Sequence, residues 1–153
     1  MNKILWFTGQ PGSGKTTLAD HLILRLSKED ISNIIHIDGD DLRDLTDNKD
    51  YSKEGRINNI KLAQKIALFC ANKGFYVIVS LVAPFKELRD EFKTKNNVLE
   101  FYLHTKEKRG KENFFSKDYQ KPSENYYDLD TGTNSIEECI DFILEKFLKK
   151  GEE

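Results

Sequence analysis

The chain has 153 residues, of which 33% are charged and 38% hydrophobic, a balance typical of a soluble domain with one core. Its formal net charge of −2 argues against a general attraction to nucleic acids or to anionic membranes. No apolar run approaches the ~20 residues that span a bilayer, and the short run at 4–8 is unlike a secretory signal. We therefore expect a cytoplasmic protein, with one domain over residues 1–150 and a short tail at 151–153.

Apolar runs bounded by turn residues predict five strands, over residues 3–8, 34–37, 75–82, 99–103 and 127–130. Apolar residues at helical spacing predict four helices, over residues 15–27, 54–73, 85–95 and 135–149. Gly74 is expected to end the second helix and Ser135 to cap the fourth. The alternation predicts an α/β fold of three layers, with a parallel five-stranded sheet and helices on both faces. The two cysteines, Cys70 and Cys139, fall in predicted helices and are expected as core residues, not as a disulfide or metal site.

The turn between the first strand and the first helix matches the phosphate-loop pattern G-x-x-x-x-G-K-[ST]. Its residues, with the one that follows, are Gly9, Gln10, Pro11, Gly12, Ser13, Gly14, Lys15, Thr16 and Thr17. Glycines let successive N–H groups point inward, and the helix start adds a positive dipole end, so an anion is held there. Lys15 is expected to reach the β- and γ-phosphates and the Thr16 hydroxyl to ligate Mg²⁺. The motif predicts a P-loop NTPase (Rossmann-like) fold that binds ATP and Mg²⁺.

A second charged stretch follows the second strand, with the sequence Asp38-Gly39-Asp40-Asp41-Leu42-Arg43. We expect it as a loop at the carboxyl edge of the sheet, where ligands of parallel sheets bind. Pro84 and Phe85 follow the third strand, and the polar segment 104–126 follows the fourth, so four loops are expected to line this edge. A carboxylate there can accept a proton from an acceptor hydroxyl or hold a Mg²⁺-bound water.

These motifs together resemble adenylylsulfate kinases, which transfer the γ-phosphate of ATP to the ribose 3′-hydroxyl of adenosine 5′-phosphosulfate. The resemblance also rests on two further stretches, Tyr51-Ser52-Lys53-Glu54-Gly55-Arg56-Ile57-Asn58-Asn59-Ile60 and Ala83-Pro84-Phe85. It implies that Asp40 is the general base, that Lys15 is catalytic, and that Asp38 and Thr16 lie at the Mg²⁺.

The resemblance also implies how an acceptor nucleotide is held. Besides Asp40, the acceptor residues that it implies are Arg43, Tyr51, Arg56, Asn59, Pro84, Phe85, Arg109 and Phe114. The arginines suit the 5′ anion, because a guanidinium binds oxyanions bidentately. Tyr51 and either Phe114 or Phe115, with Phe114 preferred, would enclose the base between two rings.

The segment 104–126 is shorter than the lid of typical family members, and Arg109-Gly110, flanked by Lys108 and Lys111, resembles a remnant of that lid. A related short form serves surface polysaccharide pathways, with cytidine 5′-diphosphoramidate as the acceptor. The residues do not separate adenosine 5′-phosphosulfate from this second acceptor, since both need Asp40, Arg43 and Arg56.

Two other hypotheses stay open from the sequence. One is a small kinase of another class, acting on a nucleoside or a sugar on the same scaffold. The other is a nucleotide-binding module without catalysis. The family resemblance also suggests a homodimer.

Overall fold

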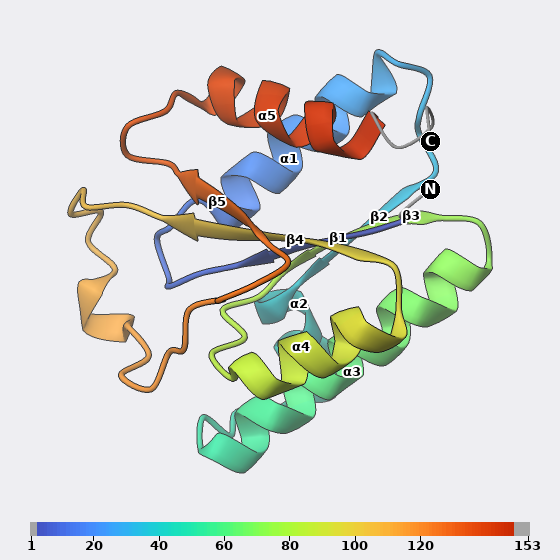
Figure 1. The fold of residues 1–153 in the computed structure, drawn as a ribbon. Coiled ribbons are helices and arrows are strands. Elements are labelled where there is room, and N and C mark those ends of the chain that lie inside the picture. Colours follow the sequence, from blue (N-terminus) through green and yellow to red (C-terminus); the bar gives the residue numbers. More distant parts are fainter. Residues whose placement is uncertain (1–2, 149–153) are drawn as a thin grey trace.

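The computed structural model describes residues 3–148, which form a five-stranded sheet covered by helices (Figure 1). The strands are β1 (Ile4–Thr8), β2 (Ile34–Asp38), β3 (Tyr76–Ser80), β4 (Val98–His104) and β5 (Tyr127–Asp130). The helices are α1 (Lys15–Ser27), α2 (Gly39–Thr46), α3 (Lys53–Asn72), α4 (Lys86–Lys95) and α5 (Ile136–Leu148), with a single 3₁₀ turn, η1 (Glu112–Phe114). The predicted end of the last helix at residue 149 and the predicted tail at 151–153 lie outside the described residues.

All neighbouring strands are parallel, in the order β2-β3-β1-β4-β5. β1 lies in the middle, where Leu5 is level with Ile78 of β3 and Leu99 of β4. The carboxyl ends of β1 and β2 therefore lie at the same edge, one strand apart. This confirms the predicted α/β architecture and brings the phosphate loop near Asp38.

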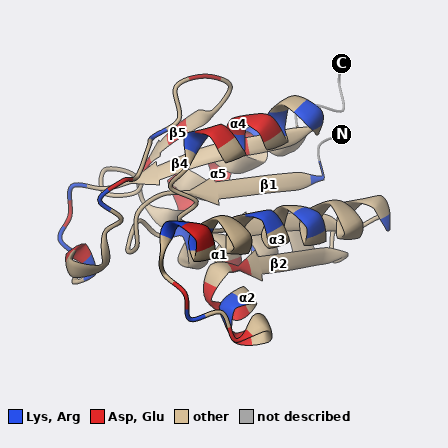
Figure 2. Ribbon diagram, turned by 90° about the horizontal axis from the view of Figure 1, so that it is seen from below, with Lys and Arg blue, Asp and Glu red and all other residues tan. Residues whose placement is uncertain are grey.

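Alternation along β1 feeds two separate cores. Leu5 and Phe7 lie in the core beneath α1 and α5, and Ile4 and Trp6 lie in the core beneath α3 and α4. All four side chains are at most 3% exposed. Because both faces of the sheet are covered, the strands read as continuous apolar runs. Figure 2 shows charged residues on the helices and loops while β1 carries none.

One predicted loop is a helix. The stretch after β2 forms α2, for which Asp38 is the N-cap, since its Oδ1 accepts from the Asp40 N–H at 3.0 Å. Leu42 is the one buried residue of this helix, at 5% exposure. The prediction of a loop over 38–43 was therefore wrong. The helix determines the backbone position of Asp40, because Asp40 lies in its first turn.

The other predicted elements shift by a few residues at their ends. β3 stops at Ser80, two residues earlier than predicted, and β4 extends to His104. Ser135 caps α5 as predicted: its Oγ accepts from the Glu138 N–H at 3.1 Å, and Glu138 Oε1 accepts from the Ser135 N–H at 2.9 Å. Cys70 and Cys139 are free thiols.

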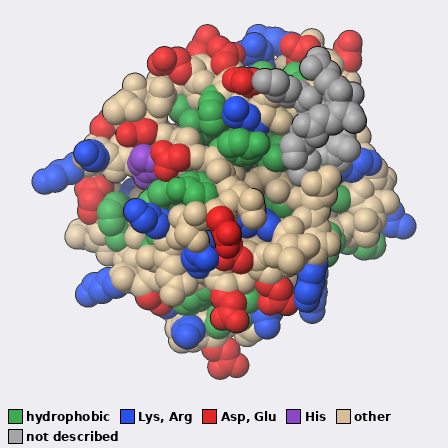
Figure 3. Space-filling model, viewed as in Figure 1, with side chains coloured by type: hydrophobic (Ala, Val, Ile, Leu, Met, Phe, Trp, Pro, Cys, Tyr) green, Lys and Arg blue, Asp and Glu red, His purple; other side chains and the backbone are tan. Residues whose placement is uncertain are grey.

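The surface seen in Figure 3 intersperses acidic and basic side chains. Among residues 3–148, no helix has the length and apolar content that a bilayer-spanning helix needs.

Candidate active site

The phosphate loop follows β1, and its tight turn depends on its glycines. Gly12 and Gly14 have φ of 83° and 104°, in a region that residues with a side chain rarely adopt. At Gly9 a Cβ would lie 2.3 Å from the carbonyl oxygen of Leu103, so no other residue fits there. The loop leads directly into α1, with Gly14 as its N-cap and no side-chain cap, so the helix N–H groups stay available for an anion.

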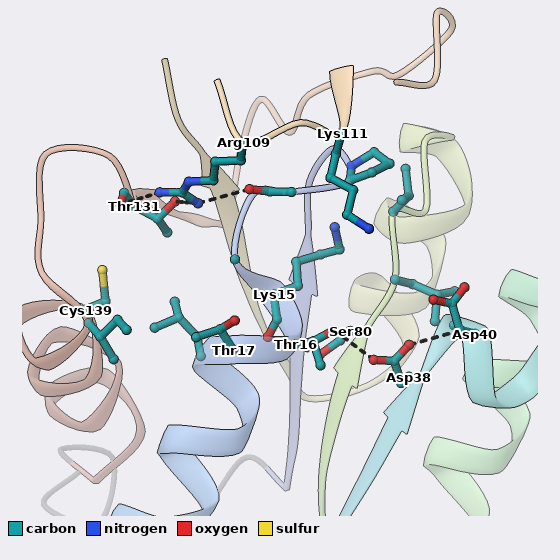
Figure 4. A pocket seen from close by; sticks show the side chains of 18 of the residues that line it. Lys15, Thr16, Thr17, Asp38, Asp40, Ser80, Arg109, Lys111, Thr131 and Cys139 are labelled. Carbon is teal, nitrogen blue, oxygen red and sulfur yellow. Dashed lines mark hydrogen bonds between the residues drawn. The ribbon is translucent and has the colours of Figure 1, made fainter. Parts of the chain in front are cut away.

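Lys15 projects from the first turn of α1 back over this loop. Its Nζ donates to the carbonyl oxygens of Gly9 and Gln10 at 2.8 and 2.9 Å. Burial lowers the pKa of Lys15 to about 8, although Asp38 and Asp40 oppose the shift. Figure 4 shows Lys111 pointing into the same cavity from the opposite side. Two cations thus converge where a polyphosphate would lie.

Two oxygen-bearing side chains meet where β2 ends and α1 begins. Thr16 Oγ1 donates to Asp38 Oδ2 at 2.8 Å, while Asp38 Oδ1 holds the Asp40 backbone (Figure 4). Ser80, at the end of β3, is hydrogen bonded to His36 Nε2 at 2.9 Å. The carboxylates of Asp38 and Asp40 both lie close enough to Lys15 for their charges to act on it.

Two cavities open side by side over this edge. The first, about 640 Å³, is lined by the phosphate loop, the start of α1 and residues from 109 to 139. The second, about 510 Å³, lies over α2 and α3. They share six lining residues, which are Pro11, Gly39, Asp40, Leu81, Val82 and Lys111. Asp40 thus stands at the junction of the two cavities.

Most of the predicted ATP residues line the first cavity: Pro11, Gly12, Gly14, Lys15, Thr16 and Thr17. Three predicted ATP residues do not line it: Gly9, Gln10 and Ser13. The loop buries two of them, Gly9 and Ser13. Most of the predicted acceptor residues line the second cavity: Asp40, Arg43, Tyr51, Arg56, Asn59, Pro84 and Phe114.

Two predicted acceptor residues lie elsewhere. Phe85 is only 8% exposed and belongs to the core beneath α3, where the Arg56 guanidinium lies 5.1 Å from its ring centre. Arg109 lines the first cavity instead of the second. Its Nη1 donates to the Gly12 carbonyl oxygen at 3.0 Å and to Thr131 Oγ1 at 3.1 Å, so it binds the phosphate loop to the end of β5.

The walls of the second cavity carry both aromatic and polar groups. Tyr51 and Phe114 are 67% and 72% exposed, and the Arg43 guanidinium lies 4.0 Å from the centre of the Tyr51 ring. Within the described part of the chain, the buried atoms Arg56 Nε and Asn59 Oδ1 have no hydrogen-bond partner. Buried polar atoms are rarely left unpaired, so one donor and one acceptor are available to a ligand here.

The segment 115–120 packs against the site through contacts that the sequence did not indicate. Tyr119 Oη is 2.8 Å from Thr8 Oγ1, and burial raises the pKa of this phenol well above its usual range. The Gln120 N–H donates to the Pro84 carbonyl oxygen at 2.9 Å. No local pattern predicts these pairings, because they join residues far apart in the chain.

A parallel sheet with a phosphate loop after its central strand, an acid at the end of β2 and a second cavity beside the first is the arrangement expected of a P-loop kinase. Comparison with known families agrees: the family model described as adenylylsulphate kinase matches residues 1–125. The chain belongs to the adenylylsulfate kinase family, and it is a phosphotransferase acting on a hydroxyl.

Two of the curated relatives have different names. The chain is 30% identical to the cytidine diphosphoramidate kinase of Campylobacter jejuni, over 94% of this chain and 95% of that protein. It is 29% identical to the adenylyl-sulfate kinase of Prochlorococcus marinus, over 95% of this chain and 83% of that protein.

Solved structures agree on the fold. The Mycobacterium tuberculosis APS kinase CysC in complex with AMPPNP and APS superposes with a TM-score of 0.84 at 23% identity, covering 96% of this chain and 98% of that one. The Cys556Ala mutant of the same kinase gives a TM-score of 0.79 at 25% identity, covering 96% and 97%.

Proposed function

We propose that this kinase transfers the γ-phosphoryl group of ATP to the ribose 3′-hydroxyl of a nucleotide that carries a 5′ anhydride, with adenosine 5′-phosphosulfate as the acceptor. The observation that carries the proposal is the junction of the two cavities at Asp40 and Lys111. ATP in the first cavity and an acceptor in the second would meet there end to end, as in-line transfer requires.

Asp40 is the proposed general base. It lines both cavities and sits in the first turn of α2, which the Asp38 cap holds in place. A carboxylate so placed accepts the proton of the attacking hydroxyl. Lys15 would leave the loop carbonyls and donate to the β- and γ-phosphates, and Lys111 would offset charge on the transferring group.

Thr16 and Asp38 fit a magnesium ion, because the hydroxyl and the carboxylate are hard oxygen donors 2.8 Å apart. In residues 3–148 no group of three or more His, Cys, Asp or Glu forms a metal cage, so phosphate oxygens and water would complete the coordination. When bound, Mg²⁺ supplies positive charge to the β- and γ-phosphates.

Arg56 and Asn59 are the proposed ligands of the acceptor's polar groups. Their unpaired Nε and Oδ1 atoms, one turn apart on α3, suit an anion and a hydroxyl or amino group respectively. Tyr51 and Phe114 supply two exposed rings that line the same cavity, between which a base would stack.

Cytidine 5′-diphosphoramidate is the second candidate acceptor. Among the curated relatives, length favours it: the chain covers 95% of the Campylobacter jejuni cytidine diphosphoramidate kinase and 80–85% of the adenylyl-sulfate kinases compared. The solved Mycobacterium tuberculosis APS kinase, of which 98% is covered, does not share this difference in length. The activity would then serve surface polysaccharide synthesis and not sulfate assimilation.

The test is ADP release from Mg²⁺–ATP with each acceptor in turn. We expect adenosine 5′-phosphosulfate to raise turnover far above the rate with ATP alone, and omission of Mg²⁺ to abolish it. A response only to cytidine 5′-diphosphoramidate would favour the second candidate. Equal rates with and without either acceptor would reject the proposal, and a response only to free nucleosides or sugars would favour another kinase class.

Asp40→Asn tests the assigned base. The amide keeps the shape but accepts no proton, so we expect kcat to fall about 10²- to 10⁴-fold while the KM for ATP changes little. Steady-state kinetics of ADP release measure both constants, and Asp41→Asn, one residue further along α2 and lining neither cavity, serves as the matched control. Unchanged kcat in Asp40→Asn would remove Asp40 from the mechanism.

A further inference from the structure

Arg56 is held in the second cavity by two residues of the segment 104–126. Its Nη1 and Nη2 donate to the two carboxylate oxygens of Asp118 at 2.8 and 2.9 Å, a bidentate pair. Nη1 also donates to Ser116 Oγ at 3.0 Å, and Ser116 Oγ donates to Asp118 Oδ1 at 2.6 Å. Consistent with this geometry, Arg56 holds the pKa of Asp118 far below its usual range.

Ser116 continues the chain of hydrogen bonds into the phosphate loop. Gln10 Nε2 donates to the Ser116 carbonyl oxygen at 2.9 Å, and the Ser116 N–H donates to Gln10 Oε1 at 2.9 Å. The two residues are thus joined by a reciprocal pair of bonds. An unbroken path leads from Gln10 through Ser116 to Arg56.

The guanidinium of Arg56 is constrained on its other side as well. The Phe85 ring, buried in the core, lies 5.1 Å from it, and the Arg56 side chain is only 24% exposed. Asp118 uses both terminal nitrogens yet leaves Nε without a partner within residues 3–148. The orientation of the arginine is therefore set before any ligand binds, and a ligand loses less side-chain freedom on binding.

We propose that Asp118 is a positioning residue for Arg56, and that Ser116 fixes this pair in register with the phosphate loop through Gln10. The inference rests on the proposed role of Arg56 in binding the acceptor. It adds that the segment 104–126, which contacts both the phosphate loop and Arg56, sets the distance between the proposed ATP and acceptor sites.

A competing role makes the opposite prediction. If the Asp118 carboxylate occupied the place of the acceptor's anion, its removal would free Arg56 and lower the KM for the acceptor. If Asp118 orients Arg56, its removal raises that KM. The direction of the change therefore separates the two roles.

The experiment is a double-mutant cycle of Arg56→Ala and Asp118→Ala, with ADP release measured against both candidate acceptors. We expect Asp118→Ala to raise the acceptor KM about tenfold, with the KM for ATP unchanged. Added to Arg56→Ala, it should have little further effect, because a residue that acts through Arg56 has nothing left to orient. Asp118→Asn keeps the shape of the side chain, so its acceptor KM should lie between that of the unaltered protein and that of Asp118→Ala. This variant also controls for misfolding.

Asp141→Ala is the matched control. Asp141 pairs with Arg25 at 3.2 Å between α5 and α1, and neither residue lines the first or the second cavity. Its acceptor KM should equal that of the unaltered protein. A crystal structure of the Asp118→Ala protein gives a readout that needs no acceptor, since the Arg56 guanidinium should leave its place.

The outcomes that overturn the inference differ from those that overturn the proposed function. If Arg56→Ala raises the acceptor KM but Asp118→Ala leaves it unchanged or lowers it, only the inference fails. Multiplying effects in the double variant, or an unmoved Arg56 in the crystal structure, also reject it. If Arg56→Ala itself leaves the acceptor KM unchanged, the assignment of Arg56 under the proposed function fails, and the inference fails with it.

Discussion

Lys15 is the residue at which burial and neighbouring charge oppose each other most clearly. Burial favours the neutral amine, whereas Asp38 and Asp40 favour the ammonium, and the pKa settles at about 8. The ligand-free protein therefore carries a charge whose hydration is incomplete and whose partners are loop carbonyls. A bound polyphosphate would supply the missing anion.

The lowered pKa gives a pH dependence of stability with a defined sign. Between pH 8 and 10.5 the unfolded chain keeps a proton on Lys15 that the folded protein has lost, so the free energy of unfolding rises with pH. We expect ligand-free Lys15→Met to be more stable than the unaltered protein at pH 7, and this difference to shrink as the pH rises to 10.5. Urea unfolding at several pH values measures it, and a difference that stays constant across this range would contradict it.

Arg109 lines the first cavity, whereas the family resemblance implied a role in binding the acceptor. Because its guanidinium bonds to the Gly12 carbonyl and to Thr131, we expect Arg109→Ala to raise the KM for ATP about tenfold and to leave the acceptor KM unchanged. Steady-state kinetics with each substrate varied in turn measures this, with Lys108→Ala as a control. A change confined to the acceptor KM would restore the earlier assignment.

At the scale of elements, the residues that stand together in the chain were the predictable ones. The loop 9–16 and the pair Asp38 and Asp40 are contiguous motifs, and the strand pattern brings them to one sheet edge. The helix α2 was missed because its eight residues bury only Leu42 and owe their start to the Asp38 cap. Other residues reach the site from parts of the chain far from these motifs, and no local pattern predicts their contacts; they are Asp118, Ser116 and Thr131.

The cap of α5 was predicted and its contribution can be measured. Ser135 Oγ accepts the Glu138 N–H at 3.1 Å, so Ser135→Ala leaves that donor without its side-chain partner. We expect the free energy of unfolding to fall by about 1 kcal/mol. The control is Ser27→Ala, which removes a hydroxyl that donates to the Leu24 carbonyl oxygen within the last turn of α1. Equal losses for the two variants in urea unfolding would show that the cap has no special weight.

For the whole molecule, a buried ion pair joins α4 to the sheet. Arg89 on α4 and Glu100 on β4 are each 2% exposed, with Nε and Oε2 3.2 Å apart. Lys93 Nζ also donates to Glu100 Oε1 at 2.7 Å. Arg89 in turn donates to the carbonyl oxygens of Ala83 and Gln120, so this pair supports the loop beside the second cavity.

Removal of the Glu100 charge leaves two cations without their buried partner. We expect Glu100→Gln to lower the free energy of unfolding by about 3–5 kcal/mol, as seen when one member of a buried pair is lost. The control is Glu91→Gln, since Glu91 pairs with Lys95 on the surface and should leave stability nearly unchanged. Similar midpoints of urea unfolding for the two variants would contradict the expectation.

The ties between the phosphate loop and the distant part of the chain have a consequence for how the protein is made. Thr131 Oγ1 donates to the Ser13 carbonyl oxygen across 118 positions of sequence, and Arg109 reaches Gly12 across 97. During synthesis on a ribosome, the loop emerges first, and its Gly12 and Ser13 carbonyl oxygens gain these partners only after Arg109 and Thr131 have followed. Capture of nucleotide should therefore begin only in the last stage of folding, after the slow closure of these long-range contacts.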